Sequence, residues 1–303
     1  MERNNSIFAI IVTYNPDSYI SENVESALKQ VNRLLIIDNN SNESSKATLQ
    51  KLSDNNQKIE LILNNENIGL AAAQNLGLEK ALFEQADWIL LLDDDSQMND
   101  NMATNMLTAY ENHADKEQIA IIAPYIEEQN AKIEPKYMLS AGQLLFKRTG
   151  FGDKEILNNV LACIASGSLI KTSTIKELGL FKTQYFIDYI DTEFCLRVIS
   201  ANYKIIAVKN AILNHHLGEK TLHNVGEIRI PTSNHSAKRR FTIYRNRVWV
   251  WKKYLFKTPN YIFYDTLASF YDIFRIAAFE KEKFTKLKMV IKGLIVGLFK
   301  ACK

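Results

Sequence analysis

Cysteine is scarce in this sequence: Cys163, Cys195 and Cys302 are its three cysteines, and no two of them form a CxxC pair. This scarcity argues against a disulfide framework and against a zinc site built from thiolates, and it fits a reducing compartment. The 303 residues, of which 47% are apolar, suffice for a core that needs no disulfides. The composition therefore predicts an ordinary globular chain of one large domain or two modest ones.

Long apolar runs are also missing. No stretch approaches the ~18 uncharged apolar residues that a transmembrane helix needs. No apolar segment precedes the strand-like run at residues 7–13 either, so we expect neither a membrane span nor a signal peptide. The net charge is only +3, but residues 281–303 hold seven lysines and one glutamate. Such a basic tail on a mildly acidic body predicts an anionic surface as a partner at that end.

Two glycine-rich phosphate loops are absent as well, because the sequence contains neither GxxxxGK[ST] nor GxGxxG. A P-loop NTPase or a Rossmann dehydrogenase would therefore lack its phosphate cradle. Residues 67–77 instead follow the pattern NxGxAxAxNxG. These small residues would let a helix and its preceding turn lie close either to a ligand or to a sheet.

Strand-like and helix-like segments alternate along the first 125 residues. Apolar, β-branched runs predict buried strands at residues 7–13, 33–38, 59–63, 88–93 and 119–124. The segments between them are expected to be helical, up to residue 30 and at 43–54, 69–83 and 100–113. This alternation is typical of βαβ units and predicts an α/β fold with a mostly parallel sheet.

The pattern changes after Pro124. Loops and short strands are expected up to residue 160, and helical sequence runs from Ser236 to the end of the chain. Between these parts we expect a strand at 166–170, a helix at 191–200, and short strands at 203–208 and 211–216.

Polar side chains follow four of the predicted strands. Ligands bind at the carboxyl ends of parallel strands, so these side chains predict a site at one rim of the sheet. Polar loops and helix caps would give the same residue types and remain an alternative for each segment. The segments are Thr13-Tyr14-Asn15, Asp38-Asn39-Asn40-Ser41, Asn64-Asn65-Glu66-Asn67 and Asp93-Asp94-Asp95-Ser96.

The three adjacent carboxylates of Asp93, Asp94 and Asp95 repel one another unless a cation neutralises them. Oxygen ligands suit Mg²⁺ or Mn²⁺, which bind substrate phosphates through one or two carboxylates. A solvated acidic turn that caps the next helix is the alternative interpretation.

Three later features have both a functional and a structural interpretation. Asp188 and Asp191 lie at the start of the helix at 191–200. They could form an N-cap with an acidic partner, or they could place a carboxylate to accept a proton. His215 or His216 could supply a third metal ligand. Residues 235–257 hold eight Lys or Arg and no Asp or Glu, and this stretch could clamp a diphosphate or form a solvated basic face.

With these residues in view, the chain resembles the family 2 inverting glycosyltransferases, and in particular their rhamnosyltransferase-like branch. The resemblance implies a GT-A fold, a Rossmann-like mixed sheet with helices on both faces, followed by a helical extension. The matching pieces are weak singly but specific as an ordered set: VTYN (12–15), IDNNS (37–41), NxGxAxAxNxG (67–77), LLLDDDS (90–96), SGSLI (166–170), GLFKTQYFIDYIDTEFCLR (179–197), HHLGE (215–219) and HSAKRRFTIYRN (235–246).

The resemblance implies a catalytic domain over 1–235, with a nucleotide-binding half (1–125) and an acceptor-binding half (126–235). A basic, amphipathic helical region covers 236–303. Donor nucleotide contacts would come from Thr13, Tyr14, Asn15, Asp38, Asn39, Asn67, Gln74, Asp93 and Asp94. Residues near the donor diphosphate would be Arg240, Tyr244, Arg245 and Asn246.

The remaining roles implied by the resemblance concern the metal and the base. Asp93 and Asp95 match the ends of the family's DxD motif. Asp95 would ligate Mg²⁺ or Mn²⁺, Asp93 would reach ribose or metal, and His215 would ligate the metal or the diphosphate. Asp191 matches the catalytic base. Many family members carry Glu where this chain has Ile190, and the branch often has Gln at the position of Asp94.

The branch implies dTDP-β-L-rhamnose as the donor and a polyprenyl-diphosphate-linked or growing surface polysaccharide as the acceptor, at the inner face of a bacterial plasma membrane. A UDP-sugar donor is the nearest alternative. A Mg²⁺ phosphohydrolase or nucleotidyltransferase, a non-enzymatic nucleotide or anionic-ligand binder, and a nucleic-acid binder also remain open, although we expect no nucleic-acid partner.

Residues 281–303 predict an amphipathic helix, because apolar residues from Phe284 to Leu298 recur at i, i+3, i+4 spacing among lysines. Such a helix is typical of a segment that lies in the membrane interface. Packing on the catalytic domain or on a second subunit of a homodimer is the alternative. Gly293 and Gly297 would weaken the helix in isolation, so it is expected to fold on contact.

Overall fold

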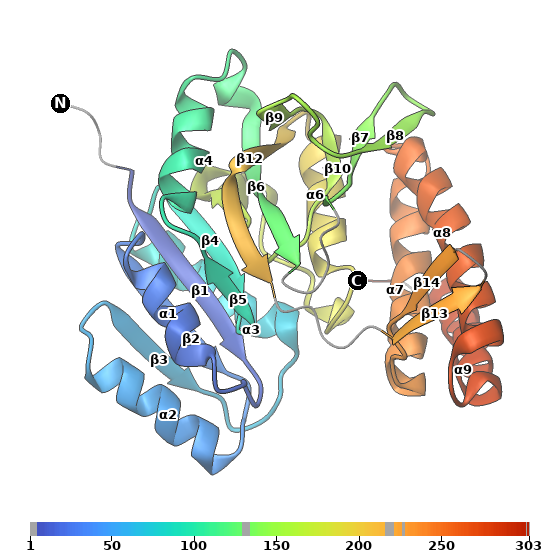
Figure 1. Ribbon diagram of the computed structural model, residues 1–303, viewed down its shortest axis with the longest axis horizontal. Coiled ribbons are helices and arrows are strands. Elements are labelled where there is room, and N and C mark those ends of the chain that lie inside the picture. The colour runs from blue at the N-terminus through green and yellow to red at the C-terminus, as the bar shows by residue number, and fades with distance from the viewer. Residues whose placement is uncertain (1–4, 129–133, 216–220, 226–227, 301, 303) are drawn as a thin grey trace.

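The computed structural model describes residues 5–128, 134–215, 221–225, 228–300 and 302. Its centre is a nine-stranded mixed sheet (Figure 1). The strands follow the order β3-β2-β1-β4-β11-β6-β12-β5, and β9 pairs with β12 outside this row. Their bounds are β1 Ile7–Thr13, β2 Arg33–Asp38, β3 Ile59–Leu63, β4 Trp88–Asp93, β5 Ser96–Met98, β6 Ile119–Glu128, β9 Ile156–Leu157, β11 Leu169–Lys171 and β12 Lys204–His215.

The first half of the sheet is parallel, as the alternation of segments predicts. β1 pairs with β2 and β4, and β2 pairs with β3, all in parallel. β12 is parallel to β6. In contrast, β11 is antiparallel to both β4 and β6, and β5 is antiparallel to β12. The fold is therefore α/β with a mixed, mostly parallel central sheet.

Helices cover both faces of this sheet (Figure 1). Side chains alternate along a strand, so Phe8 and Ile10 of β1 join one core cluster, and Ile7, Ala9 and Ile11 join the other. The first cluster takes side chains from α3 (Leu70–Phe83), α5 (Thr172–Leu178) and α6 (Ile190–Ser200), and the second from α1 (Ile20–Leu28), α2 (Glu43–Asp54) and α4 (Met102–Glu111).

The small residues of α3 allow it to lie close to the sheet. An ideal Cβ at Gly77 would lie 2.7 Å from the side chain of Ile10, so any larger residue there would force Ile10 to move. The Asn75 side chain donates to the carbonyl of Phe181 and accepts from its N–H, both at 2.9 Å. Most of the pattern at 67–77 therefore serves packing.

The second half of the chain departs from the sequence expectation in β12. The sequence predicts two short strands, at 203–208 and 211–216, with the polar residues Lys209 and Asn210 between them. The structure has one strand instead, whose register against β6 shifts between Ala207 and Ile212, at this polar interruption. β6 also continues beyond Pro124, and a small antiparallel sheet, β10-β7-β8, follows it. The remaining short elements are η1 (Lys116–Gln118), β7 (Tyr137–Ser140), β8 (Phe146–Thr149), β10 (Val160–Ala162) and η2 (Thr183–Tyr185).

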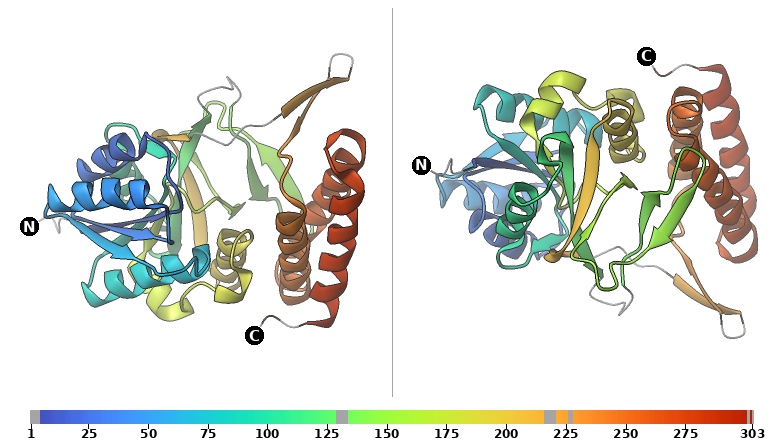
Figure 2. Two further views of the ribbon diagram at one scale, coloured as in Figure 1. Left: turned by 90° about the horizontal axis from the view of Figure 1, so that it is seen from below. Right: turned by 90° about the horizontal axis from the view of Figure 1, so that it is seen from above.

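Three helices form a separate layer beside the sheet, preceded by a two-stranded ribbon (Figure 2). The hydroxyl oxygen of Ser236 accepts a hydrogen bond from the N–H of Arg239 and caps the first helix. None of the helices in the described ranges is long and apolar enough to cross a membrane. The bounds are β13 Thr221–Val225, β14 Ile228–Thr232, α7 Ala237–Tyr254, α8 Pro259–Phe279 and α9 Lys283–Phe299.

The two glycines of α9 permit its close contact with α7. An ideal Cβ at Gly293 would lie 2.6 Å from the carbonyl oxygen of Phe241, and one at Gly297 would lie 2.7 Å from Cβ of Val248. These residues, which weaken a helix in isolation, are required here by the neighbouring backbone. One side of α9 therefore packs on the protein.

Candidate active site

A cavity of about 600 Å³ opens at the carboxyl ends of β1, β2 and β4. Its walls come from these strand ends, α3, the loop before α6, the end of β12 and the start of α7. The sequence-predicted residues that line it are Thr13, Tyr14, Asn39, Asn67, Gln74, Asp93, Asp94, Asp95, Asp191 and His215. Residues from six separate segments of the sequence therefore meet at one rim, as the topology of the sheet predicts.

Asp38 and Asn15 support this rim from outside the cavity lining. The buried carboxylate of Asp38 accepts hydrogen bonds from Thr13 Oγ1 at 2.9 Å and from the N–H of Ser41 at 2.8 Å. The side-chain oxygen of Asn15 accepts from the N–H and the amide of Asn42, both at 2.9 Å. These two residues hold the ends of β1 and β2 together.

Asn39 and Asn67 order the turn that leads into α3. The amide of Asn39 donates to Asn67 Oδ1 at 3.2 Å, and its own oxygen accepts from the N–H of Ile68 at 3.2 Å. Farther along α3, Gln74 is buried, and its Oε1 has no hydrogen-bond partner among the described residues. Buried polar atoms are normally satisfied, so this oxygen is free to accept a hydrogen bond from a group outside the protein.

Asp93, Asp95 and His215 form a compact cluster in the cavity. One ligand atom from each lies within 4.8 Å of the others, and Asp95 Oδ1 is 3.2 Å from His215 Nδ1. The antiparallel pairing of β5 with β12 places His215 opposite Ser96, next to Asp95 in the sequence. His216 lies outside the described residues. The three side chains offer the oxygen and imidazole ligands that suit a divalent cation.

Burial and mutual repulsion both act on the carboxylates of this cluster. Burial, followed by the charge of Asp95, raises the pKa of Asp93 to about 6, and the same two causes raise the pKa of Asp94 to about 7. Burial alone would lower the pKa of His215, but its hydrogen bond to Asp95 and the charges of Asp95 and Asp93 outweigh that effect and raise it. Additional positive charge at this point would stabilise the ionised carboxylates.

Asp191 reaches the cavity from the first turn of α6. It does not act as the N-cap, because the cap residue is Tyr189, in the left-handed region at φ 66°. Asp188 does not cap the helix either, since it forms an ion pair of 2.9 Å with Arg239. Burial raises the pKa of Asp191, which makes its carboxylate a better proton acceptor than an exposed one.

The loop before α6 is held by the helical region. The amide of Asn246 donates to the carbonyl oxygens of Tyr185, Ile187 and Asp188, at 2.9, 3.0 and 2.9 Å. Asn246 therefore does not line the cavity, contrary to its expected place near the diphosphate. It fixes the backbone that leads to Asp191.

The other residues expected near the diphosphate also lie outside the cavity. Arg240 is buried and pairs with Asp272, at 2.8 Å, and with Glu280. Tyr244 is buried and donates to Asp272 at 3.1 Å. The guanidinium of Arg245 donates to the carbonyl of Gln184 at 3.1 Å and stacks on Trp249. These side chains join the helices to one another and to the body. They point away from the cavity because of their positions around the axis of α7.

Arg239 and Phe186 are among the cavity residues that sequence reasoning missed. Arg239 was part of the recognised basic stretch, but only the helix direction shows that it, and not Arg240, faces the cavity. Phe186 has φ 62°, and its side chain is 45% exposed. Its carbonyl oxygen accepts a hydrogen bond of 2.7 Å from the N–H of Leu70. An ideal Cβ at Gly69 would lie 2.4 Å from its ring, which explains the glycine before α3.

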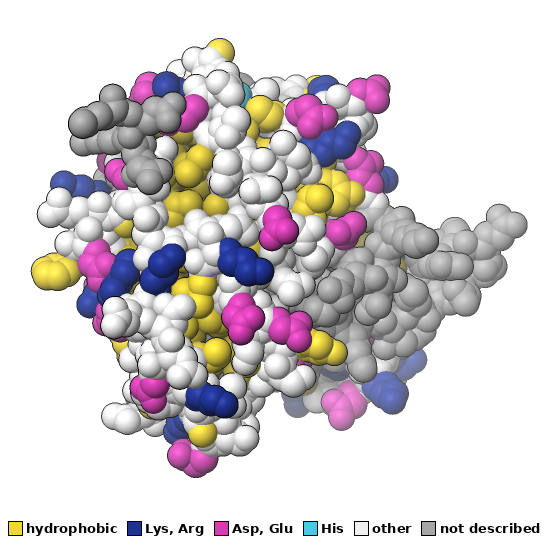
Figure 3. Space-filling view, turned by 60° about the vertical axis from the view of Figure 1, so that its left-hand side comes forward, with side chains coloured by type: hydrophobic (Ala, Val, Ile, Leu, Met, Phe, Trp, Pro, Cys, Tyr) yellow, Lys and Arg dark blue, Asp and Glu magenta, His cyan; other side chains and the backbone are white. Residues whose placement is uncertain are grey.

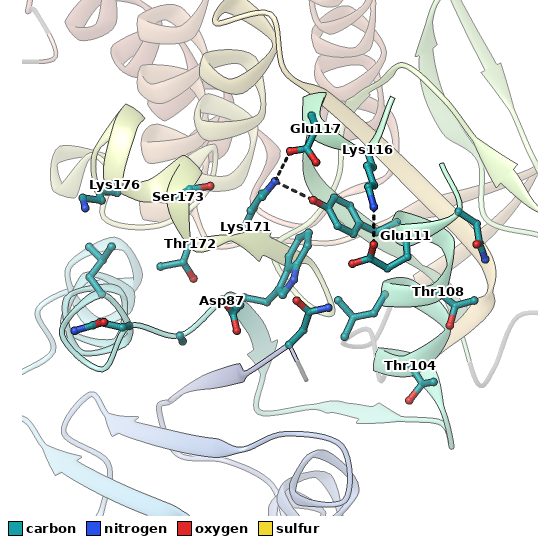
Figure 4. Close-up of a pocket in the computed structure, with 18 of the residues that line it drawn as sticks. Asp87, Thr104, Thr108, Glu111, Lys116, Glu117, Lys171, Thr172, Ser173 and Lys176 are labelled. Atoms are coloured by element: carbon teal, nitrogen blue, oxygen red, sulfur yellow. Dashed lines mark hydrogen bonds and ion pairs between the residues drawn. The ribbon is translucent and has the colours of Figure 1, made fainter. Parts of the chain in front are cut away.

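A larger cavity, of about 1580 Å³, lies at the opposite end of the strands (Figure 4). Its charged side chains pair locally: Lys171 lies 3.5 Å from Glu117, and Lys116 lies 2.8 Å from Glu111. None of the sequence-predicted site residues lines it. Because chemistry needs convergent groups rather than volume, the smaller cavity is the candidate active site.

Two solved structures resemble the fold over nearly the whole chain. GalNAc-T7 with UDP, GalNAc and Mn²⁺ has a TM-score of 0.63 and 14% identity, and the match covers 98% of this chain and 56% of that one. The mannosyltransferase PcManGT from Pyrobaculum calidifontis, with GDP-Man and Mn²⁺, has a TM-score of 0.60 and 11% identity, with coverage of 98% and 88%. These likenesses establish the GT-A fold.

Sequence comparison agrees with this fold. The dTDP-rhamnosyl transferase RfbF of Shigella flexneri is 29% identical over 263 residues, which cover 82% of this chain and 81% of the relative. The family model described as glycosyl transferase family 2 matches residues 8–179. That span is more than half of the chain and includes the ends of β1, β2 and β4 that line the cavity. The chain is a glycosyltransferase and belongs to glycosyl transferase family 2.

Proposed function

We propose that this protein is an inverting glycosyltransferase that moves L-rhamnose from dTDP-β-L-rhamnose to a polysaccharide acceptor. The observation that carries the proposal is that Asp93, Asp95 and His215 share one cavity with Asp191. A cluster that suits a diphosphate-bound cation thus lies beside a buried carboxylate with a raised pKa. The choice of rhamnose rests on the branch resemblance and on the similarity to RfbF.

On this proposal, the nucleotide lies against α3 and the ends of β1 and β2. Asn39 and Asn67 hold the backbone around it, and the unpartnered oxygen of Gln74 accepts a donor group from the nucleotide. Tyr14, which is 56% exposed at the rim, offers a ring to stack on the base. Arg239, the arginine that faces the cavity, takes the diphosphate role first assigned to Arg240 and Arg245.

We propose that Asp95, Asp93 and His215 hold Mg²⁺ or Mn²⁺. The fit rests on their ligand atoms, which lie within 4.8 Å of one another, and on the oxygen and imidazole chemistry of the three side chains. A cation bound there supplies stabilisation of the negative charge on the departing nucleoside diphosphate.

Asp191 would accept the proton of the acceptor hydroxyl as the acceptor oxygen attacks the anomeric carbon. Attack opposite the leaving group gives one displacement and inversion, so a β-donor yields an α-L-rhamnoside. The apolar Ile190 in place of a second acid leaves Asp191 as the carboxylate of α6 that lines the cavity, within the part of the chain that the structure describes.

The acceptor that we propose is a lipid-linked or growing surface glycan (O-antigen, capsule or cell-wall glycan), with the enzyme at the inner face of a bacterial plasma membrane. We also propose that residues 1–235 form the catalytic domain and 236–303 the helical region. Nucleic acid is not expected as a partner, because Arg240 and Arg247 of the basic stretch are buried in ion pairs.

The test is donor hydrolysis and transfer with a panel of dTDP-rhamnose, UDP-sugars and GDP-mannose, in Mg²⁺ and in Mn²⁺. We expect turnover with dTDP-rhamnose, its loss in EDTA and its recovery with added metal. Turnover with UDP-sugars alone would establish the second candidate donor class. Thermal stabilisation by nucleotides without any turnover would instead support a non-enzymatic binding protein.

A further inference from the structure

The outer side of α8 is a stripe of apolar side chains. Phe263, Leu267, Phe270, Tyr271 and Phe274 are 56, 49, 66, 49 and 53% exposed. Their spacing of four, three, one and three residues places them on one face of the helix. In a helix of a soluble protein such a stripe normally faces the core, whereas here it faces outward.

The charged side chains of α8 point the other way. Asp265 is 4% exposed, and its carboxylate accepts from Arg247, at 3.1 Å, and from Trp251, at 2.7 Å. Asp272 is 7% exposed and pairs with Arg240 and Arg275. The carboxylates of α8 therefore face the protein interior, while the aromatic rings of its outer stripe face outward, the reverse of the usual arrangement in a surface helix.

The outer side of α9 continues this apolar character and adds positive charge. Phe284, Ile291, Ile295, Leu298 and Phe299 are 81, 57, 50, 56 and 85% exposed. The sequence of this helix predicts a single apolar stripe, but the structure divides it: Leu287, Val290 and Leu294 pack inward, against Tyr244 and Ile276. The exposed lysines along and beside α9 are Lys281, Lys283, Lys288, Lys292 and Lys300.

We propose that the outward side chains of α8 and α9, named here the α8–α9 face, bind the surface of an anionic lipid bilayer. Both helices lie on the side of the molecule opposite β3 (Figures 1 and 2). Aromatic and aliphatic side chains would enter the boundary between headgroups and acyl chains, and the lysines would contact lipid phosphates. Since the helices do not span, they would lie along the membrane.

Charge complementarity favours lipid over a second copy of the chain. A two-fold interface brings a patch against itself, so it would bring together the exposed lysines of both α9 helices. Glu282, the N-cap residue of α9, is an exposed acidic side chain that could offset them, and the outward stripe of α8 offers none. An anionic bilayer supplies the opposite charge and covers the apolar side chains at once.

This inference rests on the proposed function in one respect: a lipid-linked acceptor gives the enzyme a reason to bind the membrane. The direction of the stripe on α8 is independent of that function, because it comes from burial alone. Membrane binding and catalysis can therefore fail separately in experiment.

The experiment is co-sedimentation of the full chain with vesicles of phosphatidylcholine alone and of phosphatidylcholine with one third phosphatidylglycerol. We expect binding to the anionic vesicles that weakens with salt. The double variant Leu267→Ser/Phe270→Ser should bind at least tenfold more weakly, and Lys288→Gln/Lys292→Gln should lose most of the dependence on lipid charge.

Matched controls come from the body of the protein. Phe83 is an 82% exposed aromatic residue at the end of α3, and Lys29 and Lys51 are exposed lysines. Phe83→Ser and Lys29→Gln/Lys51→Gln should bind vesicles like the wild type. All variants should retain the wild-type melting temperature and donor hydrolysis, since none of these side chains lines the active-site cavity.

Two results would overturn the inference. One is equal vesicle binding by the wild type and by Leu267→Ser/Phe270→Ser. The other is no binding to either vesicle, with a dimer of the wild type that this variant converts to a monomer, which would assign the face to a second copy. Vesicle binding without any donor turnover would leave the inference standing and contradict the proposed function.

Discussion

The helical region buries more charged side chains than the α/β body does. In the body, apolar residues fill two clusters on either side of the sheet. The face in Figure 3 carries scattered basic and acidic side chains with hydrophobic ones between them. In the helical region, Arg240, Arg247, Asp265, Asp272 and Glu280 are buried, while phenylalanines are exposed. The helical region therefore presents more large apolar side chains to its surroundings than the body does.

The buried charges of the helical region also connect it to the active site. Arg247 donates to the hydroxyl of Tyr189 at 2.6 Å, and Asp265 accepts from the same hydroxyl at 2.9 Å. Together with Asn246, these groups hold the loop that precedes Asp191. The helical region therefore holds in place the loop that leads to Asp191.

The largest expected effect is loss of the chemistry in the body. Asp191→Asn should lower kcat for transfer by about 10³-fold, because removal of a general base typically costs 10²–10⁴-fold. Donor affinity, measured by calorimetry with dTDP and Mn²⁺, should remain within about twofold, since the base acts in the transition state. Full turnover by the folded variant would contradict the role of Asp191.

The second prediction concerns the buried charges of the helical region. Arg240→Met should destabilise the protein by about 1.5–3 kcal/mol, because it removes buried hydrogen bonds between charged groups, while Asp272 and Glu280 keep Arg275 and Lys286 as their remaining partners. Chemical denaturation measures this change. The folded fraction should bind donor normally, since Arg240 does not line the cavity.

The adjacent Arg239 is the matched control, because it lines the cavity and its side chain is 41% exposed. Arg239→Met should change stability by less than about 1 kcal/mol while raising KM for the donor. Reversed results for the two arginines would contradict the assignment of buried charge to structure and exposed charge to donor binding.

The third prediction lies at the junction of the two regions. Asn246→Ala removes three hydrogen bonds to carbonyls of the loop before α6. We expect kcat to fall about tenfold while KM for the donor changes little, because small misplacement of a reacting group slows the chemical step. Steady-state kinetics separate the two constants. A loss of stability with unchanged kcat would assign Asn246 a purely structural role.

The smallest effect is in the pH dependence. Burial raises the pKa of Asp191 above its ordinary value near 4, and the base acts only when deprotonated. Transfer activity should therefore fall on acidification at a pH above that ordinary value. The profile of kcat/KM against pH for transfer, with Asp191→Glu as the comparison, measures the shift. An acid limb at the ordinary pKa of aspartate would contradict burial of this carboxylate.

Much of the body follows from local sequence patterns. Alternating β-branched runs and helical segments predict β1 to β4 and their parallel order, because a continuous apolar strand must be covered on both faces. The carboxyl ends of parallel strands meet at one edge of a sheet, which predicts that the residues after these strands share a site. Ten of the residues proposed for the site line the cavity. The resemblance added Asp191, whose helix position alone favoured a cap.

The arrangement of distant segments did not follow from sequence. His215 lies beside Asp95 because β5 pairs with β12 across more than a hundred residues, and no local pattern encodes that register. Which basic side chain of residues 235–246 faces the cavity also depends on how α7 is rotated about its axis. Arg239 and Arg240 are adjacent but point in different directions. Composition therefore identifies a basic stretch but not the arginine that lines the cavity.

The sequence by itself determined the fold class, the family and the acidic strand end, because each depends on short patterns that the backbone must follow. Only the tertiary structure decided which side of each C-terminal helix faces outward. α8 has apolar residues around most of its circumference, with Tyr261, Ile262 and Ile276 inside as well as the outer stripe. Its direction is set by Asp265 and Asp272, which must meet the arginines of α7 because a buried charge is stable only when it is paired.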